Sequence, residues 1–255
     1  MLVILFNCIV LNVTAQLTQS SLYDLQCEHL INPLGLDAAS PRFSWKQQDD
    51  RRGATQTAYR IWVGTDSLSL VNQHGNAWSS GWVKTSANLA RYKGKPLEAF
   101  TKYFWKVQVL DQQGKPSAPS TIASFETGMM GMKNWKGSWI SDGNDIDLKP
   151  APYFRRVIDV NKKIKSARAY IAAAGLYELY LNGQRIGDHR LDPIYTRFDR
   201  RNLYITYDVT AQLREGKNAI GVLLVMDGII INPPPYGISI MLHGEPGQHS
   251  VWISV

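Results

Sequence analysis

One short stretch, residues 176–181, constrains the fold of this chain more than any other. Its sequence is Leu-Tyr-Glu-Leu-Tyr-Leu, in which one set of side chains alternates with another, as in a strand that exposes two different faces. Asn182 and Gly183 follow directly, and an Asn-Gly pair readily adopts the positive φ angles of a two-residue hairpin turn. Gln184 then begins a return strand. The stretch therefore predicts a β-hairpin, and with it an antiparallel sheet.

The rest of the chain also has strand-like patterns, and no helical period is sustained anywhere. Short apolar and β-branched segments alternate with turns rich in Gly, Pro and Asn, which is typical of sandwiches rather than of βαβ units. In residues 103–110 the alternation leads into a hairpin, and this pattern resembles the late strands of a fibronectin type III domain. We expect an all-β chain with two tandem β-sandwiches, the first fibronectin type III/Ig-like and the second jelly-roll-like. The first would span residues 20–128, followed by a linker at 129–152 and an incomplete second sandwich at 153–224; the expected strands are 42–45, 58–63, 78–82, 103–110, 122–127, 164–174, 176–181 and 202–207.

Composition permits a packed core and gives little reason to expect nucleic acid. Hydrophobic residues make up 44% of the chain and charged residues 19%. The net charge is +7, but Lys and Arg are spread along the chain and accompany no nucleic-acid motif, so we expect no nucleic-acid partner. The eight Trp and twelve Tyr suit sheet faces. Sugar binding through Trp78 and Trp82 is the alternative to a packing role for these two side chains.

The first 15 residues have the character of a secretory signal. They are uncharged, mostly apolar and too short to span a bilayer, and Val-Thr-Ala before Gln16 fits a cleavage site. We therefore expect a secreted or periplasmic protein with no membrane span. Because Cys8 lies in the apolar run, the alternative is a lipoprotein signal, which would anchor the protein at the surface. Cys27 alone would remain in the mature chain, so no intramolecular disulfide could form, and we expect it to be buried.

Five short motifs, in this order and spacing, identify a family. The chain resembles the N-terminal β-sandwich domain of bacterial alpha-L-rhamnosidases, which are large, multidomain, inverting glycoside hydrolases. The motifs are Tyr-Glu-Leu-Tyr-Leu-Asn-Gly at 177–183, Ile-Gly-Asp at 186–188, Leu-Asp-Pro-Ile-Tyr-Thr at 191–196, Tyr-Asp-Val-Thr at 207–210 and Gly-Lys-Asn-Ala-Ile-Gly at 216–221.

The resemblance covers residues 32–224 and implies where catalysis would occur. An inverting glycosidase uses two carboxyl groups about 6.5–9.5 Å apart, one as acid and one as base. In the family both lie in a helical (α/α)6 barrel, C-terminal to the sandwiches, and this chain does not contain that barrel. The resemblance thus implies rhamnose-containing glycans as substrates of a full-length enzyme, with the barrel as partner domain. We assign no catalytic residue and no cofactor to this chain.

Other chemistry-bearing patterns are weak. There is no nucleophile elbow and no phosphate loop. Asp192, Tyr195 and Arg197 are the candidates for a sugar or interdomain contact, although Asp192 is also explained as a turn-capping residue before Pro193. No metal site is predicted, because the histidines are dispersed, at His29, His74, His189, His243 and His249.

Three functions remain open at this point. The chain is an accessory part of an alpha-L-rhamnosidase that is catalytically silent alone, an independent carbohydrate-binding module, or a structural cell-surface pair of sandwiches. The resemblance favours the first.

The family pattern stops after Leu224. The family continues with a Gly-Asn-Gly-Trp-Tyr segment, whereas this chain continues Val-Met-Asp-Gly-Ile-Ile and then reaches Pro233, Pro234 and Pro235. Codons for Val-Met-Asp-Gly-Ile-Ile can be chosen so that, with one G placed in front and the frame shifted accordingly, they read Gly-Asn-Gly-Trp-Tyr-Asn. We hypothesise that residues 225–255 are out of frame; a divergent loop is the alternative. A replaced final stretch predicts a stable first sandwich and a poorly packed second one.

Overall fold

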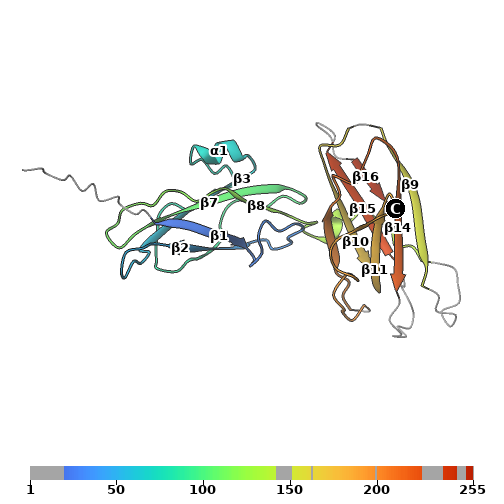
Figure 1. Cartoon of the computed structure of the whole chain (residues 1–255), viewed down its shortest axis with the longest axis horizontal. Helices are drawn as coiled ribbons and strands as arrows, with labels where there is room; N and C mark the ends of the chain where they lie inside the picture. Colours follow the sequence, from blue (N-terminus) through green and yellow to red (C-terminus); the bar gives the residue numbers. More distant parts are fainter. Residues whose placement is uncertain are drawn as a thin grey trace, which may run out of the picture. The chain divides into compact units, whose positions relative to one another are not determined.

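The prediction of an all-β chain is confirmed by a computed structural model, which describes residues 20–141, 151–161, 163–198, 200–225, 238–245 and 251–254. Figure 1 shows strands in both halves of the chain and one short helix, α1. The chain divides into two compact units. Of the described residues, the first unit contains 20–32, 40–95 and 103–124, and the second contains 33–39, 96–102 and those from 125 onward. No helix among the described residues is long and apolar enough to cross a membrane.

The first sandwich is held together by aromatic side chains that meet between its two sheets. Phe43 lies on one sheet and Trp105 on the other, and their ring centroids are 4.6 Å apart. Both are buried, as are Trp45 and Ile61, so the inward residues of the two sheets share one core. One sheet contains β1 (Ser21–Cys27), β2 (Arg42–Gln48) and β6 (Leu89–Arg91); the other contains β4 (Trp78–Ser79), β3 (Ala58–Gly64), β7 (Lys102–Leu110) and β8 (Ala123–Glu126), with β5 (Val83–Lys84) also paired to β3.

Two local features of this sandwich differ from the sequence-based expectation. Of the strand predicted at 78–82 only β4 is formed, and a second short strand, β5, begins just after it; Gly81 between the two has a φ of +61°. An unexpected helix, α1 (Ser67–Val71), begins after Asp66, whose carboxylate accepts hydrogen bonds from the backbone N–H groups of Leu68 and Ser69. Its five residues are too few to create a visible helical period. The buried position of Cys27 agrees with expectation.

The second sandwich packs two four-stranded sheets around a core drawn from both. Ile171 on one sheet and Tyr177, Leu179 and Val222 on the other are all buried in the same cluster. A single 3₁₀ turn, Met132–Asn134, precedes it. One sheet has the order β13 (Tyr204–Asp208), β10 (Ser166–Ala173), β15 (Ile238–Glu245), β16 (Val251–Ser254), and the other has the order β12 (Gln184–Ile186), β11 (Leu176–Leu181), β14 (Gly216–Val225), β9 (Tyr153–Val160).

The predicted hairpin is confirmed. Strands β11 and β12 are antiparallel, and Leu181 pairs with Gln184, which leaves Asn182 and Gly183 as the two turn residues. Their φ angles are +52° and +82°, the positive values that such a turn requires. The Asn182 side chain also accepts the backbone N–H of Ala219, so the turn is tied to β14.

Residues after 224 take part in the second sandwich. Strand β15 pairs with all eight residues of β10, and Ser239 and Ile240 are buried. Trp135 donates its indole N–H to the Ser239 hydroxyl over 2.9 Å. Backbone pairing and the buried Ile240 thus join this stretch to the sheet of β10. The poorer packing expected of the second sandwich stays a prediction, which a comparison of the protease resistance of the two sandwiches would test. The three prolines lie outside the described residues.

A buried ion pair lies within the second unit. Arg168 on β10 donates from Nε and from one terminal nitrogen to the two carboxylate oxygens of Glu126, each over 2.9 Å. The two side chains are only 10% and 8% exposed. Arg168 also lies 3.1 Å from Asp208 on β13. Because both partners of the bidentate pair are desolvated, loss of either one leaves a buried charge without its main partner.

Replacing Glu126 with Ala should therefore destabilise the second unit by about 3 kcal/mol. Urea unfolding followed by circular dichroism, fitted with one transition for each compact unit, measures the change. Lys46→Ala removes an exposed ion pair with Asp24 and serves as the control, with an expected effect below about 1 kcal/mol. Equal effects of the two substitutions would contradict the assignment of Glu126 as a key buried partner.

Candidate functional site

The three predicted contact residues lie on one loop, residues 187–203 between β12 and β13, but they do not form one surface. Asp192 is buried, with 7% of its area exposed. Tyr195 and Arg197 are exposed. The structure thus separates an internal anchor from an exposed loop tip.

Asp192 holds the loop against the core of the second sandwich. Its backbone N–H and C=O exchange hydrogen bonds with those of Tyr177, at 3.1 and 2.7 Å. One carboxylate oxygen accepts the hydroxyl of Tyr207, and the other lies 3.1 Å from Nδ1 of His189. The hydroxyls of Tyr177 and Tyr207 are 3.2 Å apart. The interpretation of Asp192 as a local turn cap is therefore wrong: its carboxylate accepts from a strand residue fifteen positions later.

Burial determines the chemistry of this cluster. Desolvation raises the pKa of both Tyr177 and Tyr207 well above the ordinary range, so both phenols stay protonated and can donate. The carboxylate of Asp192 is buried and already contacts Tyr207 and His189, which favours a role in positioning the loop over direct contact with a sugar. By contrast, Asp208 does cap a turn, because it accepts the backbone N–H of Thr210.

The loop tip presents apolar surface. Ile194 is 77% exposed, Tyr195 47% and Leu191 41%. The ring of Tyr195 packs edge-on against the buried ring of Phe198, at 5.4 Å between centroids, which orients it. Nearby, the carbonyl of Arg197 accepts two backbone N–H groups and closes a tight turn. Such a tip is suited to contact with another apolar surface.

The tryptophans considered for sugar binding have other contacts. Trp78 packs against Phe43 and Tyr92 in the first sandwich. Trp82 is 40% exposed, but the guanidinium of Arg60 lies 4.5 Å from its ring centroid. The same guanidinium lies 4.6 Å from the ring of Trp62 and so stands between two indoles.

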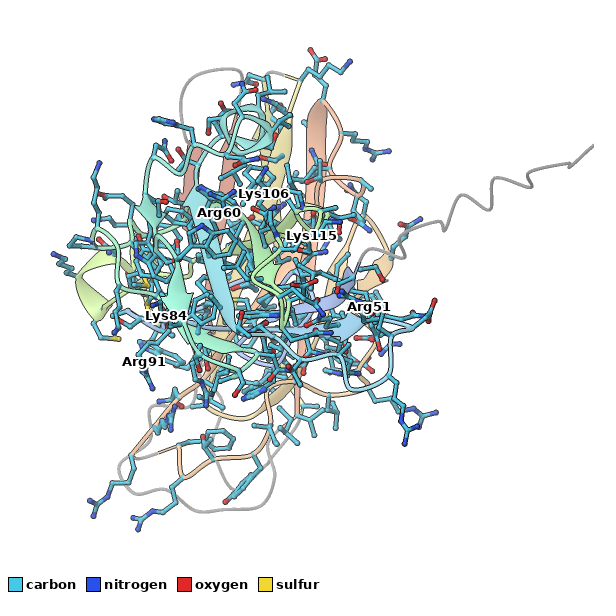
Figure 2. The ribbon with its side chains drawn as sticks, turned by 90° about the vertical axis from the view of Figure 1, so that its left-hand side faces the viewer. Arg51, Arg60, Lys84, Arg91, Lys106 and Lys115 are labelled. Atoms are coloured by element: carbon cyan, nitrogen blue, oxygen red, sulfur yellow. The ribbon has the colours of Figure 1, made fainter. Side chains whose placement is uncertain are left out.

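A second cation extends this arrangement into a cation–π ladder. Figure 2 labels Arg60, which lies on β3, and Lys106, which lies on β7. The ammonium of Lys106 is 5.3 Å from the Trp62 ring centroid. Burial lowers the pKa of Lys106, and its ammonium donates to the backbone carbonyl of Val71 over 3.4 Å. These contacts favour the packing role for Trp78 and Trp82.

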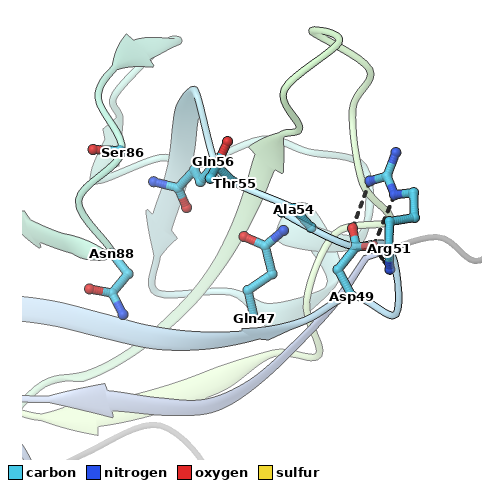
Figure 3. A pocket seen from close by; sticks show the side chains of 9 residues that line it. Gln47, Asp49, Arg51, Ala54, Thr55, Gln56, Ser86 and Asn88 are labelled. Carbon is cyan, nitrogen blue, oxygen red and sulfur yellow. Dashed lines mark hydrogen bonds and ion pairs between the residues drawn. The ribbon is translucent and has the colours of Figure 1, made fainter.

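A polar cleft of about 550 Å³ lies in the first sandwich (Figure 3). Most of its side chains already serve the fold. Asp49 pairs with Arg51 at 2.6 Å, and Arg51 also reaches Asp111 at 2.8 Å. Gln56 accepts the indole N–H of Trp45 and donates to two backbone carbonyls. The cleft is thus a hydrogen-bonded end of the sandwich. No group of three or more potential metal ligands occurs among the residues that the structure describes.

Comparisons with known proteins agree with the fold of both halves. Residues 22–131 match the profile of the Rha78A-like N-terminal immunoglobulin domain, and residues 162–231 match that of the alpha-L-rhamnosidase N-terminal domain. An alpha-L-rhamnosidase of Formosa agariphila is 35% identical over 216 residues, which are 76% of this chain and 23% of that protein. One of Streptomyces avermitilis is 32% identical over 218 residues, 76% of this chain and 21% of that protein.

A solved structure supports the same assignment. The alpha-L-rhamnosidase from Dictyoglumus thermophilum is 40% identical, with a TM-score of 0.85, over 92% of this chain and 29% of that one. The fold and the matches define a tandem β-sandwich region of a glycoside hydrolase. The chain belongs to the alpha-L-rhamnosidase family as an N-terminal portion, and it spans less than a quarter of the curated relatives' length.

The pKa of His189 depends on its contact with Asp192, so its titration tests that contact. The hydrogen bond to Asp192, with a smaller contribution from the charge of Asp188, raises the pKa of His189 above its ordinary value of 6.5. The pair therefore stabilises the fold fully below pH 6.5, and this contribution disappears as the pH rises through the folded-state pKa. An NMR titration should give a raised midpoint that falls toward 6.5 in Asp192→Asn. Identical midpoints in the two proteins would show that Asp192 does not hold this histidine.

Proposed function

We propose that this chain is the accessory front part of an enzyme that hydrolyses terminal alpha-L-rhamnosides, and that it is catalytically silent by itself. The observation that carries the proposal is the pair of adjacent family matches, both to N-terminal domains of alpha-L-rhamnosidases. Hydrolysis with inversion would require an acid and a base on a catalytic barrel that follows these domains in the full-length protein. Rhamnose-containing glycans would be the substrates of that protein.

The exposed loop tip supports a role in contacting the rest of the enzyme. Ile194 and Tyr195 present apolar area, whereas Asp192 is fully engaged inside the sandwich. Apolar area held in a fixed shape is typical of an interdomain contact. In this proposal Tyr195 and Arg197 contact another domain, and Asp192 fixes the loop that carries them.

An independent carbohydrate-binding protein is the second candidate function. The observation that favours it is a trough on the second sandwich whose lining includes Tyr153 and Tyr180. A structural pair of cell-surface sandwiches has no specific observation in its favour.

The proposal also assigns roles to the two ends of the sequence. The apolar residues 1–15 would act as a signal that directs a secreted or periplasmic protein. Residues 225–255 would be encoded out of frame. The family motifs that end by Leu224 support this, whereas the match to the family's N-terminal domain continues to residue 231 and speaks against a change at Val225 itself. An intact reading frame, with no barrel encoded downstream in another frame, would contradict the assignment of the tail.

The chain alone should release no 4-nitrophenol from 4-nitrophenyl alpha-L-rhamnopyranoside. The protein made from the same locus, with the reading frame restored after Leu224 and the downstream region included, should release it. Absorbance at the nitrophenolate band measures both. Hydrolysis by the 255-residue chain, or no hydrolysis by the extended protein, would refute the proposal that the downstream region, and not this chain, carries the catalytic activity.

A further inference from the structure

A trough of about 430 Å³ lies on the outer face of the sheet formed by β12, β11, β14 and β9. Its main lining residues are Tyr153, Arg155, Tyr180, Gly221 and Leu223. All five belong to the second compact unit and lie on the face opposite to the core, since the alternate residues Ile220 and Val222 are buried.

Strand register places Gly221 at the floor of the trough. Gly221 pairs with Tyr180 of β11 on one side and with Arg155 of β9 on the other. Strands are spaced by about 4.8 Å, so the backbones that carry Tyr180 and Arg155 are about 10 Å apart across the glycine. Two positions along, Leu223 pairs with Tyr153 and with Glu178.

The backbone gives no reason for a glycine at position 221. Its φ is not in the left-handed region, and the pairing with both neighbouring strands runs through it without a bulge. A Cβ at this position would meet nothing closer than 3.8 Å. Glycine in the middle of a regular strand weakens the strand, and where no bulge or bend accounts for it, the close approach of a ligand or of another backbone is a common reason.

The walls have the chemistry that a sugar ring requires. The side chain of Tyr153 is 80% exposed, and Tyr180 stands across the trough. The Tyr180 hydroxyl donates to Glu178 over 2.6 Å, which fixes the direction of the phenol ring. Glu178 is not a lining residue, but it pairs with the lining residue Leu223, so its carboxylate lies next to the trough. Arg155 adds guanidinium donors from the opposite side. Aromatic faces suit the C–H face of a pyranose, and the carboxylate and guanidinium suit its hydroxyls.

We propose that this trough is a binding site for one pyranose residue of a glycan, with the ring over Gly221 between Tyr153 and Tyr180. Hydroxyls of the sugar would hydrogen-bond to Glu178 and Arg155. The site binds and does not cleave. The proposal rests on the proposed function only for the choice of the first probe, methyl alpha-L-rhamnopyranoside.

Gly221→Val tests the site because a valine suits a strand and fills the floor of the trough. The whole chain, labelled with ¹⁵N, is titrated with methyl alpha-L-rhamnopyranoside and then with the methyl glycosides of glucose, galactose and mannose. At least one sugar should shift the amide signals of Gly221 and its neighbours on β9 and β11. Gly221→Val should abolish this shift, and Tyr153→Ala should weaken binding at least about tenfold.

Lys217→Val is the matched control, because it places the same side chain on the same strand and face outside the trough. Its binding should equal that of the unchanged chain. Tyr153→Ala alters an exposed side chain and keeps the test decisive if Gly221→Val does not fold.

Two results would overturn the proposal. One is that no sugar shifts these signals; the other is that the shifts persist in Gly221→Val. Self-association of the unchanged chain that Gly221→Val abolishes, seen by light scattering, would instead assign the face to protein contact. Neither result affects the rhamnoside assay, which is measured as hydrolysis, so the failure of one proposal is distinguishable from the failure of the other.

Discussion

The second unit depends on the buried contact between Arg168 and Glu126. Two charged groups that are at most 10% exposed are stable in such a place only if they satisfy each other with good geometry. The guanidinium does so with two parallel hydrogen bonds, and its third contact, to Asp208, ties β10 to β13. The residues just after position 124 are thereby fixed to β10 in a single orientation.

Strand β13 forms contacts on both faces of its sheet, because successive side chains on a strand point to opposite faces. On one face, Tyr204 donates to Asp37 over 2.8 Å. On the same face, Thr206 lies so close to Gly35 that any Cβ there would clash with its hydroxyl. On the other face, Tyr207 bonds to Asp192 and so anchors the loop that presents Tyr195.

These contacts explain why the compact units and the family matches divide the chain differently. Residues 33–39 and 96–102 lie within the stretch matched by the immunoglobulin domain, yet they cluster with the second unit. The family match delimits a domain by sequence similarity among relatives. The compact unit instead groups residues that are in contact in space. Asp37 and Glu126 form hydrogen bonds with strands of the second sandwich, and the ring of Phe100 packs edge-on against Tyr170 on β10.

The sequence predicted local features well and distant partners poorly. Alternation and Asn182-Gly183 were sufficient for the hairpin, because turn and strand propensities act between neighbouring residues. The burial of Asp192 was not predictable in the same way, since Asp-Pro is an ordinary turn signal and its partner Tyr207 is far along the chain. A five-residue helix at Ser67–Val71 left no period to detect. The trough over Gly221 depends on the register of three strands, which no single stretch of sequence contains.

Hydrogen exchange tests most directly whether the second unit needs residues 33–39, 96–102 and 125–131. Exchange rates of the β10 and β13 amides are measured in the whole chain and in a chain that begins at Met132. Without Asp37, Phe100 and Glu126 the protection of these amides should fall by roughly a hundredfold or more. Equal protection in the two chains would show that the second sandwich is complete without these segments, and would contradict the dependence of the second unit on the Arg168–Glu126 pair.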